Sequence, residues 1–174
     1  MIKEILKNLA RKKSVTPRLE EADSFTDEAA KIIALQAGID RVFRRSLRIR
    51  QVDAGSCNAC EWECTALTNP IYDIQRFGID FVASPRHADL LLVTGPVSRQ
   101  MVLALKKTYI ATPEPRLVVA CGDCGIDGGI YKGSYAVTNG VSAVIPVDCI
   151  IQGCPPSPVQ IIEGLVTLLK KLTD

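Results

Sequence analysis

The chain has 174 residues and a formal net charge of +2, a length typical of one domain. Its 47% hydrophobic and 23% charged residues match a globular protein and exclude a disordered or fibrous chain. The longest apolar run, residues 88–95, has only strand length, and the first residues lack the apolar core of a secretory signal. We therefore expect a soluble intracellular protein.

The first third of the chain carries most of the positive charge. Residues 1–50 contain twelve Lys and Arg against seven Asp and Glu, whereas residues 51–174 contain nine against twelve. A basic arm indicates contact with another surface, but this one is too short and too mixed in sign for a nucleic-acid module. We therefore expect no nucleic-acid partner.

The basic arm is expected to be helical. Residues 2–13 have apolar side chains at helical spacing, which fits either a short surface helix or a basic amphipathic helix on a membrane or a partner. Residues 14–25 have the composition of a linker, and Thr26 is expected to cap a following helix. These features predict a helical N-terminal extension over residues 1–46 and an α/β domain over residues 47–174.

Short β-rich runs alternate with helical stretches after residue 47. The predicted strands are Leu47–Val52, Ile79–Ala83, Asp89–Thr94, Leu117–Ala120 and Ala143–Val147, and the clearest helices are Ser98–Tyr109 and Ser157–Leu172. The third and fourth runs are almost entirely apolar, which is typical of parallel strands covered on both faces. The pattern predicts a flavodoxin-like open parallel sheet with helices on both faces.

Seven cysteines are the strongest feature of the sequence. They form three groups: Cys57, Cys60 and Cys64; Cys121 and Cys124; Cys149 and Cys154. Without an export signal, cysteines are expected to be metal ligands or redox groups rather than a disulfide framework. Each group lies in or near a segment that follows a predicted strand, and such segments meet at the carboxyl edge of an open parallel sheet.

The surroundings of individual cysteines suit a bulky cofactor. Cys57 and Cys60 form a CxxC motif, which can bind a metal or act as a redox pair. Cys124 lies in a glycine-rich run that lets the backbone approach a group closely. Cys154 is followed by Pro155, as ligands are in bacterial ferredoxin motifs.

A zinc site is the main alternative. It would need Cys121 and Cys124 as a second pair, which leaves Cys154 unexplained. A thioredoxin-like thiol pair would leave all the other cysteines unexplained. The residues therefore favour an iron–sulfur cluster over zinc, and zinc over a thiol pair.

Five linked motifs carry a resemblance to a known family. They are DAGSCNACE at 53–61, SPRHAD at 84–89, VTGPV at 93–97, GDCGIDGG at 122–129 and PVDCIIQGCPP at 146–156. Residues 47–172 thereby resemble the small subunit of membrane-bound energy-converting [NiFe] hydrogenases, including formate hydrogenlyase, and its relative, the cluster-bearing B subunit of NADH:quinone oxidoreductase. The CxxC spacing is hydrogenase-like, because the quinone-reductase relative typically has adjacent cysteines there. Membrane-bound sulfur reductases carry similar small subunits and stay an alternative.

The resemblance implies one [4Fe–4S] cluster with Cys57, Cys60, Cys124 and Cys154 as ligands. It implies an oxidoreductase subunit without catalytic residues of its own, which passes electrons from ferredoxin-like iron–sulfur subunits to the Ni–Fe centre of a large subunit. Hydrogen evolution is the expected direction. Membrane-arm subunits would hold the complex at the cytoplasmic face of the cell membrane.

Three cysteines fall outside the family pattern. Cys64, Cys121 and Cys149 are expected to be small buried apolar residues, although Cys64 and Cys121 could act as substitute ligands. Glu61 and Glu63 fit either a proton relay or a solvated or partner-facing pair, and we favour the second interpretation.

Other charged residues are expected to have structural roles. Arg86, His87 and Asp89 are expected to hold the loop before a strand. Surface or partner-facing charges are expected at Arg44, Arg45, Arg48 and Arg50.

Overall fold

The computed structural model describes residues 30, 33, 35–43 and 45–173. The expected helix over residues 2–13, the linker, the cap at Thr26 and the expected charge at Arg44 lie outside these residues. Contacts join residues 31–174 into one compact unit. In the part of the chain that is described, no helix is both long enough and apolar enough to cross a membrane.

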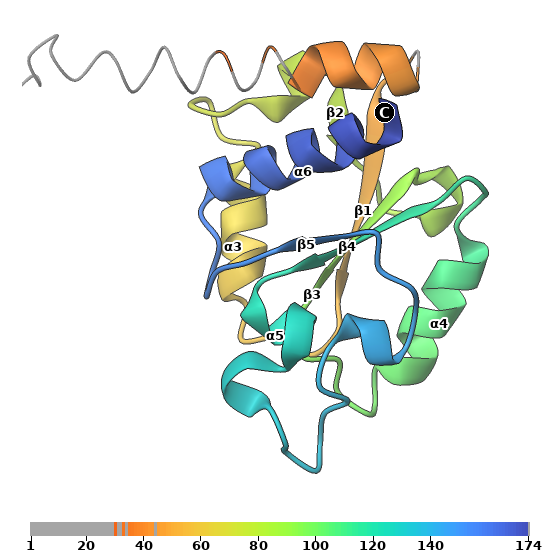
Figure 1. The fold of residues 1–174 in the computed structure, drawn as a ribbon, viewed down its shortest axis with the longest axis vertical. Coiled ribbons are helices and arrows are strands. Elements are labelled where there is room, and N and C mark those ends of the chain that lie inside the picture. Colours follow the sequence, from red (N-terminus) through yellow and green to blue (C-terminus); the bar gives the residue numbers. More distant parts are fainter. Residues whose placement is uncertain (1–29, 31–32, 34, 44, 174) are drawn as a thin grey trace, which may run out of the picture. The chain divides into compact units, whose positions relative to one another are not determined.

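Five parallel strands form one open sheet (Figure 1). Along the sheet they lie in the order β2 (Ile79–Phe81), β1 (Leu47–Asp53), β3 (Leu90–Thr94), β4 (Leu117–Cys121) and β5 (Cys149–Ile151). This 2-1-3-4-5 order is that of flavodoxin-like folds, so the predicted fold class is confirmed.

The central strand β3 is buried along its whole length because both faces of the sheet are covered. Leu90 and Leu92 belong to one hydrophobic cluster, and Leu91 and Val93 belong to the other. Side chains that alternate between two faces need apolar residues at every position of such a strand. The unbroken apolar run in the sequence therefore encodes a central strand.

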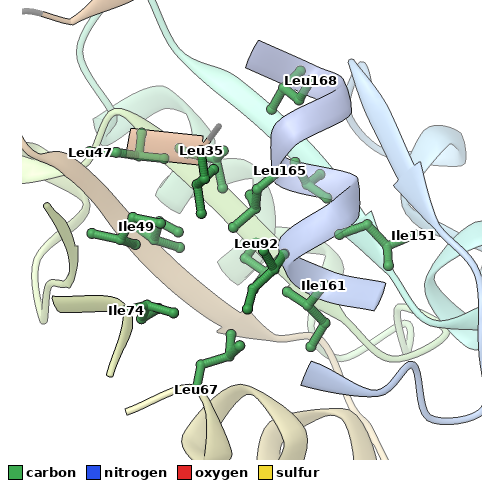
Figure 2. Close-up of a cluster of buried hydrophobic side chains, with 14 of the residues drawn as sticks. Leu35, Leu47, Ile49, Leu67, Ile74, Leu92, Ile151, Ile161, Leu165 and Leu168 are labelled. Carbon is green, nitrogen blue, oxygen red and sulfur yellow. The ribbon is translucent and has the colours of Figure 1, made fainter. Parts of the chain in front are cut away.

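Helix α6 (Pro158–Thr173) covers one face of the sheet. It begins with a capping box, in which Ser157 N donates to Gln160 Oε1 at 2.8 Å and Gln160 N donates to Ser157 Oγ at 3.4 Å. Its apolar stripe packs beside β1 and β3 (Figure 2); the side chains are Ile161, Ile162, Leu165, Leu168 and Leu169.

The helical residues 35–42 contribute Leu35 and Ile39 to the same core, although we expected this segment in the N-terminal extension. Gly38 permits close contact with α6, because a Cβ atom there would lie 3.2 Å from Leu169 Cβ. The core of the compact unit therefore includes residues that precede position 47.

Helix α4 (Val102–Ala111) packs on the opposite face, where Leu105 is fully buried. The helix begins later than the predicted start at Ser98. Ser98 N donates to Ala54 O at 2.8 Å, and Ser98 forms an isolated bridge with Val137. The backbone of Ser98 therefore belongs to the loop layer above the sheet and not to the helix.

The strand predicted at Ala143–Val147 is wrong. Residues Val141–Ala143 form a 3₁₀ turn, and Ile145 N donates to Val141 O at 3.0 Å. Pro146 has no N–H to give to a neighbouring strand. The edge strand is instead β5, which follows Asp148 and pairs with β4.

Candidate metal centre

The predicted ligands come together at the carboxyl edge of the sheet. Cys57 and Cys60 follow β1, Cys124 follows β4, and Cys154 follows β5. Burial raises the pKa of the Cys124 thiol, and the charges of Cys154, Cys57 and Cys60 raise it further. Cys154, Cys57 and Cys60 therefore all lie within electrostatic range of Cys124.

The loop after β1 places Cys57 and Cys60 in different environments. Asp53 Oδ1 accepts hydrogen bonds from Gly55 N at 2.8 Å and Ser56 N at 2.9 Å, which closes a tight turn. Asn58, with φ of 71°, then leads into α3 (Ala59–Ala66). Cys57 is consequently exposed on the loop, whereas Cys60 is buried in the first turn of the helix.

Gly122 makes room for Cys60 at the end of β4. Its φ is 83°, and a Cβ atom at this position would lie 2.6 Å from Cys60 Sγ. Only glycine avoids both the unfavourable φ and the clash with the sulfur. The glycine-rich run identified in the sequence thus leaves space here for the sulfur of a predicted ligand.

Asp123 joins the loops that carry Cys124 and Cys154. Asp123 Oδ1 accepts from Gly153 N at 2.9 Å, and Asp123 N donates to Gly153 O at 2.9 Å. Cys124 follows Asp123 in the short helix α5 (Asp123–Asp127), and Cys154 follows Gly153. No sequence motif predicted this role of Asp123, although an aspartate directly before a predicted ligand is a usable signal.

An exposed ion pair closes the segment after Cys124. Lys132 Nζ lies 2.7 Å from Asp127 Oδ2, and Gly129 N donates to Asp127 Oδ1 at 3.0 Å. The Lys132 hydrogen bond lowers the pKa of Asp127 below its usual value. These contacts fix the turn that brings Gly129 against Cys124, where a Cβ atom would lie 3.0 Å from the sulfur.

The three cysteines outside the family pattern are buried in the hydrophobic core, as expected. Cys121 has polar contacts as well. Hydrogen bonding to Cys60 and Cys64 raises the pKa of Cys121 far above the ordinary thiol range. Hydrogen bonding from Cys121 lowers the pKa of Cys60.

The carboxylate of Glu61 is not solvated, so this part of the favoured interpretation is wrong for Glu61. Both of its side-chain oxygens are buried, and neither has a hydrogen-bond partner among the described residues. Its charge opposes ionisation of the neighbouring Cys60.

Asp89 holds the loop before β3 through its side chain, whereas Arg86 and His87 contribute through their backbones, with Arg86 N donating to Ser84 Oγ at 3.4 Å and His87 N to Ser84 O at 3.2 Å. The Asp89 carboxylate accepts from Arg45 at 2.6 Å and from Arg48 N at 3.1 Å. Arg45 is therefore an ion-pair partner and not a free surface charge. In the described part of the chain, the exposed side chains of Arg86 and His87 make no such bond and line a cavity of about 310 Å³.

The donor chemistry fits an iron–sulfur cluster. Four thiols from three loops supply the sulfur ligands that such clusters use, and Gly122 and Gly129 keep side-chain atoms away from two of them. Within the described residues, no three His, Cys, Asp or Glu side chains stand in position to chelate a single metal ion.

The comparisons with known proteins agree with the resemblance. Residues 57–168 match the family described as NADH ubiquinone oxidoreductase, 20 Kd subunit. A probable membrane-bound hydrogenase subunit of Pyrococcus furiosus is 44% identical over 74% of this chain and 77% of its own length. Formate hydrogenlyase subunit 7 of Escherichia coli is 40% identical over 79% of this chain and 54% of its own length.

One further relative and one solved structure also match. An NADH-quinone oxidoreductase subunit of Herpetosiphon aurantiacus is 44% identical over 67% of this chain and 64% of its own length. A chain in the structure of an archaeal membrane-bound sulfane sulfur reductase matches with a TM-score of 0.66 and 34% identity, over 79% of this chain and 75% of that chain. The chain therefore belongs to the NADH ubiquinone oxidoreductase 20 Kd subunit family, whose relatives named above are subunits of oxidoreductase complexes.

Proposed function

We propose that the chain is an electron-transfer subunit that holds one [4Fe–4S] cluster through Cys57, Cys60, Cys124 and Cys154. The observation that carries this proposal is that Cys57 and Cys60 follow β1, Cys124 follows β4 and Cys154 follows β5, so that all four thiols stand at the same edge of the parallel sheet. When bound, such a cluster supplies one-electron transfer at a potential set by its ligands, hydrogen bonds and solvent exposure.

The chain's own residues would place the ligands and control access of water. Asp53 shapes the loop of Cys57, and Asp123 ties the loop of Cys124 to that of Cys154. Cys57 and Cys154 are exposed, whereas Cys60 is buried against β4. The site is thus closed toward the core and open toward a partner.

Exposed apolar side chains in the segments that follow the predicted ligands support a covering partner. Trp62 follows Cys60 by two positions and is 67% exposed, and Ile130 and Tyr135 follow Cys124 and are 78% and 88% exposed. Large exposed aromatic and aliphatic groups mark protein interfaces when they gather at one site. A partner seated there would exclude water from the exposed ligands.

We assign the partner as a [NiFe] hydrogenase-like large subunit in a hydrogen-evolving complex. The hydrogenase-like spacing of Cys57 and Cys60 and the hydrogenase names of two relatives support this choice. Ferredoxin-like iron–sulfur subunits would donate electrons, and membrane-arm subunits would hold the complex at the inner face of the cell membrane. No residue of this chain is assigned a catalytic role.

A quinone- or sulfur-reducing complex is the second candidate. It is favoured by the relatives from NADH-quinone oxidoreductase and sulfane sulfur reductase, which match over comparable parts of this chain.

Anaerobic purification of the native complex tests the proposal. Iron, sulfide and nickel are measured together with hydrogen evolution, for the wild type and for Cys124→Ala, Cys154→Ala and the buried control Cys149→Ala. We expect all three elements and hydrogen evolution, lost with the first two variants and kept with the third. Iron and sulfide without nickel would indicate the second candidate, and zinc alone would refute electron transfer.

A further inference from the structure

A second cavity of the molecule lies at the edge of the sheet opposite the candidate metal centre. Its lining residues belong to three segments: residues 42–48 reach the start of β1, residues 86–89 precede β3, and residues 113–115 precede β4. All three segments lead into parallel strands, so we call it the amino-edge cavity. Its volume of about 310 Å³ is roughly ten times the share of a water molecule in the liquid, which leaves room for a ligand of several atoms.

Cationic side chains dominate the polar lining of the amino-edge cavity. They are Arg45, Arg48, Arg86 and His87, and the carboxylates in the same lining are those of Asp89 and Glu114. Both carboxylates already have partners. Asp89 accepts from Arg45 at 2.6 Å and from Arg48 N at 3.1 Å, and Glu114 accepts from Arg116, which lies outside the cavity lining.

Arg48 and Arg86 are left without a charge partner. No ion pair among the described residues includes either guanidinium group. Asp80 is the neighbour of Arg48 in the register of β1 and β2, yet it makes no ion pair with it. Both arginine side chains are exposed, so their donors are available to an anion from outside the chain.

The backbone holds both arginines in fixed positions. Arg48 lies in β1 between Leu47 and Ile49, which are fully buried. Arg86 lies in the 3₁₀ turn Pro85–His87, where its N–H donates to Ser84 Oγ at 3.4 Å. A fixed backbone lowers the ordering cost that binding has to overcome.

We propose that the amino-edge cavity binds the phosphate group of a phosphate monoester through the guanidinium groups of Arg48 and Arg86. A phosphate monoester carries a charge of about −1.5 to −2 at pH 7 and three strong acceptor oxygens, which matches two unpaired guanidinium groups, whereas a carboxylate would neutralise only one. Phe43, Pro113 and Pro115 supply an apolar part of the lining for the carbon substituent of the ester. This inference goes beyond the proposed function and does not depend on a cluster.

Calorimetric titration of the full chain with inorganic phosphate, at constant ionic strength, tests the site. We expect Arg48→Gln and Arg86→Gln each to weaken binding about tenfold or more, because each removes charge-assisted hydrogen bonds. Arg99→Gln is the matched control, since Arg99 is an exposed arginine that follows β3 at the other edge of the sheet, and it should bind as the wild type does. Circular dichroism checks that each variant folds.

The wild type also tests the chemistry by itself, because phosphate should bind more tightly than acetate. Equal affinity for the two anions would overturn the proposal. Wild-type phosphate affinity in both Arg48→Gln and Arg86→Gln, or an equal loss in Arg99→Gln, would overturn it as well.

Vesicles distinguish a lipid headgroup from a soluble phosphate ester as the source. Cosedimentation of the full chain is compared between phosphatidylcholine vesicles with and without phosphatidic acid. A preference for phosphatidic acid that is lost in Arg86→Gln and kept in Arg99→Gln would support the site and identify the lipid. Phosphate binding that depends on Arg86, without such a preference, would support a soluble ester. Absence of both effects would refute the site.

Discussion

The environment of each cysteine determines what its sulfur can do. Cys57 and Cys154 are exposed, Cys124 is half-buried, and Cys60 is buried. Desolvation and like charge disfavour a thiolate, whereas a hydrogen bond favours it. The four predicted ligands therefore differ in reactivity before any metal is bound.

Cys124 is expected to react slowly with alkylating agents in the metal-free chain. Burial and the charges of neighbouring thiolates raise its pKa, so its thiolate forms only above the ordinary thiol pH range. Removing one neighbour with Cys154→Ser should lower the pH at which alkylation of Cys124 is half-maximal, and Cys149→Ser should leave it unchanged. Mass spectrometry of iodoacetamide-labelled peptides across pH measures both effects. A midpoint that did not move in Cys154→Ser would contradict the electrostatic coupling.

Gly122→Ala should abolish cluster binding. The substitution combines an unfavourable φ, costing about 1–3 kcal/mol, with a methyl group placed 2.6 Å from Cys60 Sγ. Gly133→Ala is the matched control, because Gly133 has a similar φ of 79° but no atom within 4 Å of the added Cβ. Iron and sulfide content of the two variants measures the difference. Equal losses in both would show that backbone strain, and not contact with Cys60, is responsible.

At the scale of elements, the hydrophobic pattern predicted the central strands correctly. It placed the last strand of the sheet, the edge strand β5, at the wrong residues. β3 and β4 lie in the interior of the sheet, so their apolar runs stand out in the sequence. β5 is a short edge strand of three residues, and its middle residue Ile150 is exposed. The run at 143–147 was therefore predicted as the strand in place of β5. Pro146 prevents regular strand pairing there.

The site was predicted through its motifs and not through its geometry. The family motifs supplied the four candidate ligands, and the strand order brought them together. The approach of Gly122 to Cys60 and the contacts of Asp123 depend on how α3, β4 and the loop after β5 pack against each other. No local sequence pattern encodes such long-range contacts.

Helix α6 is expected to contribute strongly to the stability of the fold. Leu165→Ala removes a side chain that is only 1% exposed and should cost about 2–5 kcal/mol in the free energy of unfolding. Leu172→Ala, on the same helix but 44% exposed, should cost less than about 1 kcal/mol. Urea denaturation of the full chain measures both. Similar costs would mean that α6 does not pack as described.

At the scale of the whole compact unit, the two edges of the sheet have different chemistry. The carboxyl edge carries the predicted ligands with exposed apolar groups beside them. The amino edge carries Arg45, Arg48, Arg86 and His87 around a cavity, with Asp89 paired to Arg45. Exposed aromatic and aliphatic groups suit a tight partner that excludes water, whereas a cluster of charges stays stable in contact with solvent.

This polarity predicts which surface changes disrupt assembly. Trp62→Glu and Tyr135→Asp place charges beside the ligands and should lower recovery of the large subunit at least tenfold, because buried aromatic anchors dominate interface energies. Ile110→Glu is the control, since Ile110 is 75% exposed but lies at the end of α4 near the amino edge. All three should fold normally, because surface substitutions usually change stability by about 0.5 kcal/mol or less. Affinity purification of the tagged chain, with quantification of the copurified large subunit, measures the effect. Wild-type recovery with Trp62→Glu and Tyr135→Asp, or an equal loss with Ile110→Glu, would place the partner on another surface.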